Sequence, residues 1–279
     1  MKNLLSLVIF CIPLLVTAQQ FHLSIHGGVS NYQGDLQEKR YSLQQSHIAY
    51  GAGILYEISD KLYARLNITK GVISADDKLS KKNVARNLNF TSTILDLHLG
   101  VEYHLLNIYE YRFSPYVFAG LSGYHFNPYT TIAGSNTKIY LQPLGTEGQG
   151  FYQNRSKYKL YQIAIPFGGG VKFAISDNTK IGIEIGLRKL FTDYIDDISK
   201  TYVPDQASLT ANNGLLATEL SFRGDELSPP KQYPDLHFIR GNPESGDWYY
   251  FSVISISTRL NTGQKGRNGK YNQTSCPTF

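Results

Sequence analysis

The chain has 279 residues, of which 42% are hydrophobic and 18% charged, and its formal net charge at pH 7 is +5. This charge is modest, is spread along the chain and comes with no nucleic-acid-binding motif, so we expect no nucleic-acid partner. Beyond the N-terminus no segment approaches about 18 consecutive apolar residues, which excludes helical membrane spans. A mean hydropathy of −0.26 is still compatible with a membrane β-barrel, because only every second strand residue faces lipid.

The N-terminus has the pattern of a secretion signal. Lys2 provides a positive charge, Leu4–Val16 is mostly apolar, and Val16-Thr17-Ala18 resembles a signal-peptidase cleavage motif. The apolar run is too short for a stable membrane-spanning helix, and Cys11 lacks the small preceding residues typical of lipoproteins. We therefore expect residues 1–18 to be a signal peptide and the mature protein to leave the cytoplasm.

Strict alternation of apolar and polar residues is clearest in Thr179–Arg188. Its odd positions hold Ile181, Ile183, Ile185 and Leu187, and its even positions hold Gly182, Glu184, Gly186 and Arg188. In a β-strand this spacing places the aliphatic side chains on one face and the charged ones on the other. Related patterns predict eight strands, at Phe21–Tyr32, Ile48–Ile58, Leu62–Ser74, Thr91–His104, Phe113–Asn127, Lys157–Ala174, Thr179–Arg188 and Asp247–Leu260.

The connections between these strands alternate between short and long. Ser59-Asp60-Lys61 and Ser176-Asp177-Asn178 read as tight turns, Leu105–Arg112 is also short, and the other four connections are long. An even-stranded barrel has both termini at the periplasmic rim, where connections are short, and it sends its long loops outward. The sequence therefore predicts an all-β fold: an eight-stranded antiparallel transmembrane β-barrel over residues 19–260, in contact with the lipid of the bacterial outer membrane.

A barrel of eight strands is narrow enough for side chains to fill its interior. We therefore expect a plugged barrel and not a pore. Mixed charges on the inward faces can neutralise one another through charge-assisted hydrogen bonds, which buried charges require. The predicted lumen charge network consists of Glu57, Arg65, Asp96, Glu102, Lys172, Glu184 and Arg188.

Two segments outside the strands have features of their own. The longest loop, Thr192–Gly246, is rich in proline and polar residues, and we expect a short helix near Leu215–Phe222. The tail, residues 261–279, carries no acidic residue and by topology lies in the periplasm. It is either a solvated end or a partner-binding segment, and Cys276 leaves pairing with another chain open. The tail residues predicted to contact a partner are Lys265, Arg267, Lys270 and Phe279.

Several patterns allow a chemical interpretation that we do not favour. His22, His26, His98 and His104 fall on predicted inward faces, but their spacing matches no compact metal motif. We expect neutral histidines filling the lumen, with no metal and no cofactor. The aspartates Asp193, Asp196 and Asp197 have the chemistry of a calcium site at the outer rim, although a solvated acidic loop is the preferred interpretation.

Two glycine-rich stretches are also better explained by structure than by chemistry. Gly145–Gly150 lacks the lysine and the following helix of a phosphate-binding loop. Gly168-Gly169-Gly170 lies inside a predicted strand, where it is typical of a bend or bulge at a crowded barrel corner.

Four motifs in this order resemble the PorG-like outer-membrane barrels of Bacteroidota, and the likeness covers nearly the whole mature chain. The motifs are Asn31-Tyr32-Gln33-Gly34-Asp35-Leu36, Gln142–Gly150, Ile165–Lys172 and Phe191–Asp197. The resemblance implies an outer-membrane component of the type IX secretion system. It also implies partners in the periplasmic ring, namely a PorK-like lipoprotein and a PorN-like protein. It supplies no catalytic residue.

The main functional hypothesis is therefore a non-enzymatic anchor in a secretion and gliding machinery. The barrel would hold the protein in the membrane, while the basic tail and rim residues such as Tyr109, Tyr111 and Phe113 would contact the periplasmic ring. The alternative is a binding module whose extracellular loops recognise a ligand or a secreted substrate. A lipid-modifying enzyme and an open channel are weaker hypotheses, because no nucleophile constellation is evident and the lumen is predicted to be filled.

Overall fold

The computed structural model describes residues 20–260, apart from 38, 40, 81–82, 133–135, 154, 235–237 and 245. The predicted signal peptide and the predicted partner-binding tail, with Lys265, Arg267, Lys270 and Phe279, lie outside these residues. Within the described part of the chain, no helix has the length and apolar character to span a membrane.

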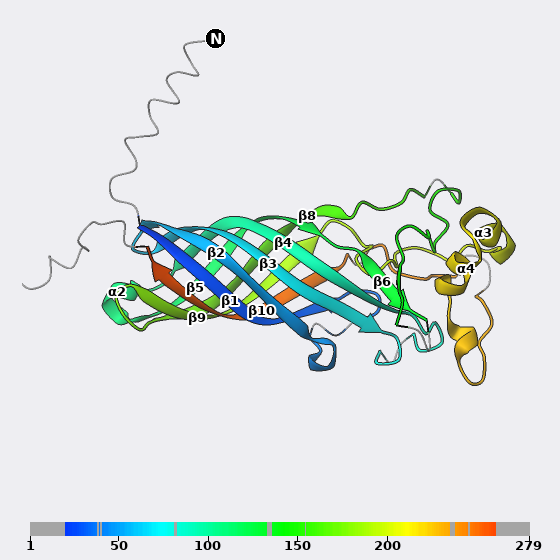
Figure 1. Ribbon diagram of the computed structural model, residues 1–279, viewed down its shortest axis with the longest axis horizontal. Coiled ribbons are helices and arrows are strands. Elements are labelled where there is room, and N and C mark those ends of the chain that lie inside the picture. Colours follow the sequence, from blue (N-terminus) through cyan, green and yellow to red (C-terminus); the bar gives the residue numbers. More distant parts are fainter. Residues whose placement is uncertain are drawn as a thin grey trace, which may run out of the picture.

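Eight long strands form a closed antiparallel barrel (Figure 1). Each strand pairs with the next one along the chain, and the first pairs with the last, so the wall has no free edge. This confirms the predicted fold class. The strands are β1 (Gln20–Gln33), β2 (His47–Ser59), β3 (Leu62–Asp76), β4 (Asn89–His104), β5 (Phe113–His125), β8 (Tyr161–Ala174), β9 (Thr179–Leu190) and β10 (Trp248–Arg259).

The outer face of the wall is aliphatic. Leu99 of β4, Leu121 of β5 and Ile163 of β8 are each more than 60% exposed, while the residues between them in the strands point inward. Apolar surface left in water would cost about 25 cal/mol per Å², whereas in a bilayer it contacts hydrocarbon. A closed barrel with such a belt is an outer-membrane protein, as the sequence predicts.

Aromatic rings mark both edges of this belt, where a bilayer meets water. At the end with the short connections, the ring of Phe113 lies 5.1 Å from that of Phe173, between centroids. At the other end, the His125 and Tyr161 rings lie 4.6 Å apart. The two sets of rings therefore mark where the bilayer begins and ends along the length of the barrel.

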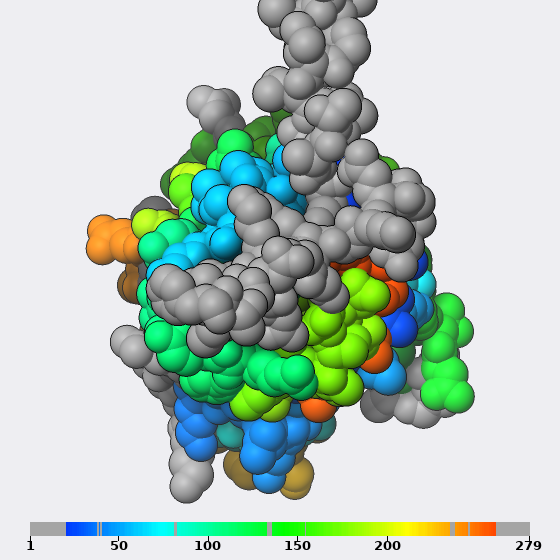
Figure 2. Space-filling view, turned by 90° about the vertical axis from the view of Figure 1, so that its left-hand side faces the viewer, coloured from blue at the N-terminus to red at the C-terminus, as the bar shows by residue number. Residues whose placement is uncertain are grey.

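The short connections all lie at one end of the barrel, together with the start of β1 and the end of β10 (Figure 1, left). They are residues 60–61, 105–112 with α2 (Ile108–Tyr111), and 175–178. Figure 2 looks onto this end and shows the 105–112 and 175–178 connections close together at the rim. This is the periplasmic end, because both chain ends of an even-stranded barrel emerge there.

The long connections form a layer at the opposite, extracellular end (Figure 1, right). We call residues 34–46, 77–88, 126–160 and 191–247 the cap. The helix expected near Leu215–Phe222 is present as α4 (Leu215–Ser221), whereas the other cap elements were not predicted. Those are η2 (Leu43–Gln45), β6 (Pro128–Thr131), β7 (Lys138–Tyr140), α3 (Gln206–Asn213) and η3 (Gly224–Glu226).

The glycines of β8 do not form the predicted bend or bulge. Pairing of β8 with β9 runs in one unbroken register from Ala164 to Ala174. A Cβ atom at Gly168 would clash with the carbonyl oxygen of Ile185 and would lie 2.9 Å from the Phe118 ring. One at Gly170 would clash with the carbonyl oxygen of Ile183 and would lie 2.8 Å from the Tyr116 ring. These glycines therefore make room in the lumen for two large aromatic residues, a packing role that the local sequence does not reveal.

Candidate functional site

The centre of the lumen is filled by ion pairs between opposite walls. Arg65 of β3 donates to both carboxylate oxygens of Glu184 of β9, at 2.8 and 3.1 Å. Glu184 also accepts from the Tyr116 hydroxyl at 2.8 Å, and the Arg65 guanidinium lies 4.2 Å from the centre of the Phe118 ring. Bidentate geometry of this kind is what makes a buried arginine–carboxylate pair tenable.

A second carboxylate, Glu102 of β4, completes this central group. Glu102 pairs with Lys172 of β8, lies 2.8 Å from His104 Nε2, and lies 3.5 Å from Arg65. A cavity of about 30 Å³ between Arg65, Glu184 and Arg188 has room for only one or two water molecules. The predicted filled lumen is thus present at mid-barrel.

Towards the extracellular end, Asp96 of β4 accepts a hydrogen bond from the Tyr249 hydroxyl at 2.6 Å. Arg188 Nε lies 3.7 Å from Asp96, and the Arg188 guanidinium lies 4.5 Å from the centre of the Phe251 ring. This pair is separate from the central group.

The periplasmic end of the lumen is closed by a third group around Glu57. The Tyr109 hydroxyl, from α2, donates to Glu57 at 2.6 Å and accepts from Arg259 at 2.6 Å. His22 Nε2 lies 3.2 Å from the same carboxylate, and Lys180 Nζ lies 3.3 Å from the Tyr109 hydroxyl. The Tyr109 hydroxyl therefore points into the end of the barrel. The sequence had instead suggested a rim residue that contacts a partner.

All seven residues of the predicted lumen network point inward and are buried or nearly so, but they form three groups and not one network. Sequence reasoning missed Lys180 and Arg259, which also lie inside. Alternation along the strand could have predicted the inward position of Lys180, because Lys180 and Glu184 are an even number of residues apart. Among the described residues, no histidines, cysteines and carboxylates gather into a group of three or more suited to a metal ion.

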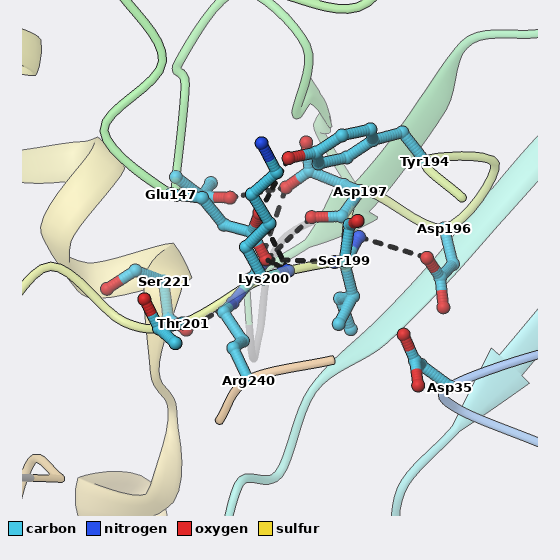
Figure 3. Close-up of polar contacts among 12 residues, drawn as sticks. Asp35, Glu147, Tyr194, Asp196, Asp197, Ser199, Lys200, Thr201, Ser221 and Arg240 are labelled. Carbon is cyan, nitrogen blue, oxygen red and sulfur yellow. Dashed lines mark hydrogen bonds and ion pairs between the residues drawn. The ribbon is translucent and has the colours of Figure 1, made fainter. Parts of the chain in front are cut away.

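The cap is held together by buried arginines that connect different loops, and Figure 3 shows one of them, Arg240, beside Glu147. Arg240 donates to the carboxylate of Glu147 at 3.1 Å, to the carbonyl of Asp197 at 2.6 Å and to that of Ser221 at 3.1 Å. Glu147 is fully buried and also accepts from the backbone N–H of Ser199 at 2.9 Å. Burial alone would lower the pKa of Arg240, but the carboxylates of Glu147 and Asp197 raise it, so the guanidinium remains charged.

Two further arginines extend this framework. Arg86 pairs with Asp77 through two bonds of 2.8 Å, and it also donates to the carbonyl oxygens of Asp35, at 3.1 Å, and Arg240. Arg155 donates to the carbonyl of Glu147 and to both oxygens of Thr201, at 2.7 to 2.9 Å. All four long connections are therefore joined by charged hydrogen bonds into one ordered unit.

The prediction that Asp193, Asp196 and Asp197 form a solvated acidic loop is wrong, because Asp196 and Asp197 are buried. Asp197 accepts from the Thr146 and Tyr158 hydroxyls at 2.5 and 2.7 Å. Burial raises the pKa of Asp197 to about 6 and that of Asp193 to about 7. These carboxyls are part of the core of the cap.

Asp196 and Asp247 share one hydroxyl group. The Tyr32 oxygen lies 2.6 Å from Asp196 and 3.1 Å from Asp247. A phenol has a single proton, so it can donate to only one of the two carboxyl groups at a time. Burial, followed by the nearby carboxylates, raises the pKa of both aspartates well above the ordinary range.

The chain belongs to the family described as a domain of unknown function, DUF6089, whose model matches residues 1–213. No curated protein matches the chain. Solved structures of low similarity include the surface protein NspA of Neisseria, with 8% identity and a TM-score of 0.45, and Ail of Yersinia pestis, with 10% identity and a TM-score of 0.41. A major outer-membrane protein of Thermus thermophilus has 12% identity and a TM-score of 0.43. Each comparison covers 88% of this chain and 100% of the other.

Proposed function

We propose that this outer-membrane barrel is a non-enzymatic anchor for a periplasmic assembly. The observation that carries the proposal is the closed lumen: charged pairs fill its centre, and Tyr109 with Arg259 and Glu57 closes the periplasmic end. A lumen filled in this way leaves no route for solute, so transport through the barrel is excluded and a function must rest on an outer surface such as the wall or the periplasmic rim.

The assembly that we propose is the ring of a type IX secretion machinery, with its PorK-like lipoprotein and PorN-like protein. Support comes from the PorG-like motifs. Asn31–Leu36 runs from the end of β1 into the cap, and Phe191–Asp197 lies in the cap next to the barrel mouth. The contacts would come from the tail residues Lys265, Arg267 and Lys270 and from exposed rim residues. Charged tails steer association but add limited affinity at physiological salt, so a stable anchor also needs the rim.

The experiment is a crosslinking pull-down from outer membranes with the full-length protein and with a chain ending at Leu260. A variant with Lys265, Arg267 and Lys270 changed to Gln is the matched control, because it keeps the tail length and removes its charge. Capture of ring proteins that is lost in both variants assigns the contact to the tail charges. Capture that survives both assigns it to the rim, and no capture with any of the three proteins refutes the secretion role.

A second candidate function is recognition of a ligand or secreted substrate by the cap. The ordered framework of Arg86, Arg155 and Arg240 favours it, because a surface that binds specifically gains from being preorganised. Phe238 and Ile239 project from the cap and are 61% and 68% exposed. If the cap is the functional surface, changing both to Ser impairs secretion in cells, whereas Leu43→Ser, at an 82% exposed cap position, does not. Normal secretion with both variants would refute this candidate.

A further inference from the structure

A groove interrupts the lipid-facing wall where β1, β10 and β9 lie side by side. Its volume is about 340 Å³. Isoleucine side chains form its walls, and Gly27 lies between them. The residues that line it are Ile25, His26, Gly27, Ile181, Ile254, Ser255 and Ile256.

The strand register and one glycine explain the groove. Ile25 is paired with Ile256, which is paired in turn with Ile181, so three branched side chains stand in a row across the strands. In the next row towards the extracellular end, Gly27 is paired with Ile254. A Cβ atom at Gly27 would meet nothing closer than the Ala49 carbonyl, 4.0 Å away. The missing side chain is therefore a true gap in the aliphatic belt and not a point of close backbone approach.

The groove lies in the periplasmic half of the membrane. Ile181 is two residues from the start of β9 and Ile256 is three residues from the end of β10, and strands rise about 3.3 Å per residue. One row closer to the periplasm, Thr179 is paired directly with Thr258. Both share the outward parity of the isoleucines, so two hydroxyl groups stand at the periplasmic end of the groove.

We propose that this groove seats one acyl chain of a phospholipid from the periplasmic leaflet. The groove opens sideways into hydrocarbon, and an unfilled gap would lose the dispersion contacts of the surrounding isoleucines. A flexible acyl chain fits an irregular aliphatic groove without any polar partner. The two threonine hydroxyls, one row closer to the periplasm, can donate hydrogen bonds to the ester oxygens of such a lipid.

This choice of ligand follows from the order of chemistry along the wall. An apolar groove alone fits any hydrophobic segment, but the Thr179–Thr258 pair places two hydroxyl groups side by side at the periplasmic end. The row at the other end has a single hydroxyl, that of Ser252, which lies 3.4 Å from the Tyr41 hydroxyl. A diacyl phospholipid has the same order, with ester oxygens next to its headgroup and hydrocarbon towards the centre of the membrane. The inference does not depend on the proposed secretion role, since it concerns the wall of the barrel alone.

The test uses the full-length protein in bilayer nanodiscs with a small fraction of phosphatidylethanolamine that carries a photoreactive acyl chain. Crosslinks are mapped by peptide mass spectrometry. We expect several-fold more crosslinks around Gly27 and Ile254–Ile256 than around Leu121 on β5. Gly27→Leu fills the gap and reduces the groove crosslinks to the level of the remaining wall.

Gly123→Leu is the matched control. Gly123 also faces outward, and a Cβ atom there would meet nothing within 4 Å, so this variant adds the same side chain away from the groove and leaves the crosslinks unchanged. Changing both Thr179 and Thr258 to Val reduces the groove crosslinks without filling the groove. Retained heat-modifiable migration on gels verifies that each variant is folded. Uniform crosslinking of the wild-type wall, or an unchanged pattern in Gly27→Leu, would overturn the inference.

Discussion

Replacement of Arg240 by Met should open the cap and leave the barrel intact. Arg240 is 3% exposed, and its guanidinium contacts Glu147 and two backbone carbonyl groups, those of Asp197 and Ser221. Methionine fills similar space but leaves the buried Glu147 and Asp197 without their positive partner. Removing one member of a buried pair costs about 3–5 kcal/mol, because the remaining charge is stranded in a poorly polar environment.

This cost should appear as a change in local opening. At about 1.4 kcal/mol per tenfold change in an equilibrium constant, the opening constant of the cap rises by roughly 10²- to 10³-fold or more. When cleavage is slow compared with reclosing, the proteolysis rate follows that constant. We therefore expect rapid cleavage within residues 191–247 of the folded protein, while the strands remain resistant and gel migration remains heat-modifiable.

A second-site change and a control sharpen this test. In the double variant Arg240→Met with Glu147→Gln, one stranded charge is gone, so much of the protease resistance returns. Glu226→Gln removes the partner of Arg223 at a 41% exposed carboxylate, where ion pairs contribute about 1 kcal/mol or less, and it changes cleavage little. Unchanged proteolysis of Arg240→Met, or equal loss of barrel and cap, would show that Arg240 does not hold the cap as a separate unit.

Three further predictions concern the cap, the lumen and conductance. The raised pKa values of Asp196 and Asp247 mean that the protonated forms favour the folded cap. Their contribution is present below the unfolded pKa of about 4 and is lost as pH rises through the raised folded values, so proteolysis of the cap quickens as pH rises above about 4. An Asp247→Asn variant that keeps the full slope would contradict this. Arg65→Met leaves Glu184 in the lumen without its positive partner and lowers the free energy of unfolding in urea by about 3–5 kcal/mol. A loss under about 1 kcal/mol would show that the pair is dispensable. In planar bilayers both the wild type and Tyr109→Ala give no steady conductance, because the central ion pairs remain, and steady current from either would refute the filled lumen.

The barrel was predictable because its information is local. Alternation with a period of two follows from the strand backbone itself, so Glu184 and Ile183 could be assigned to opposite faces from sequence alone. Their partners could not, because pairing across the lumen depends on register and side-chain reach. Glu57 therefore meets Tyr109 from α2, 52 positions along the chain, and it takes no part in the central group. No local pattern encodes such a contact.

The cap was not predictable for a related reason. Its core consists of charged and polar residues, and a sequence rich in Asp and Arg reads as solvated surface unless the partners are known. Asp197 is buried only because Arg240, Thr146 and Tyr158 reach it from distant parts of the chain. The glycines of β8 mislead in the same way, since the space they provide is occupied by Phe118 from β5.

The two ends of the molecule support different functional proposals, and their structures make these proposals separable. An anchor needs only a stable wall and a periplasmic rim, and long extracellular loops cost such a protein little entropy if left unstructured. Here the loops are instead ordered by arginines that bury charge, an arrangement that in some proteins serves to fix one defined shape. If Arg240→Met opens the cap and secretion continues, the cap shape serves another role and the anchor suffices. If secretion stops while ring proteins are still captured, the same barrel both anchors the ring and presents a surface that secretion requires.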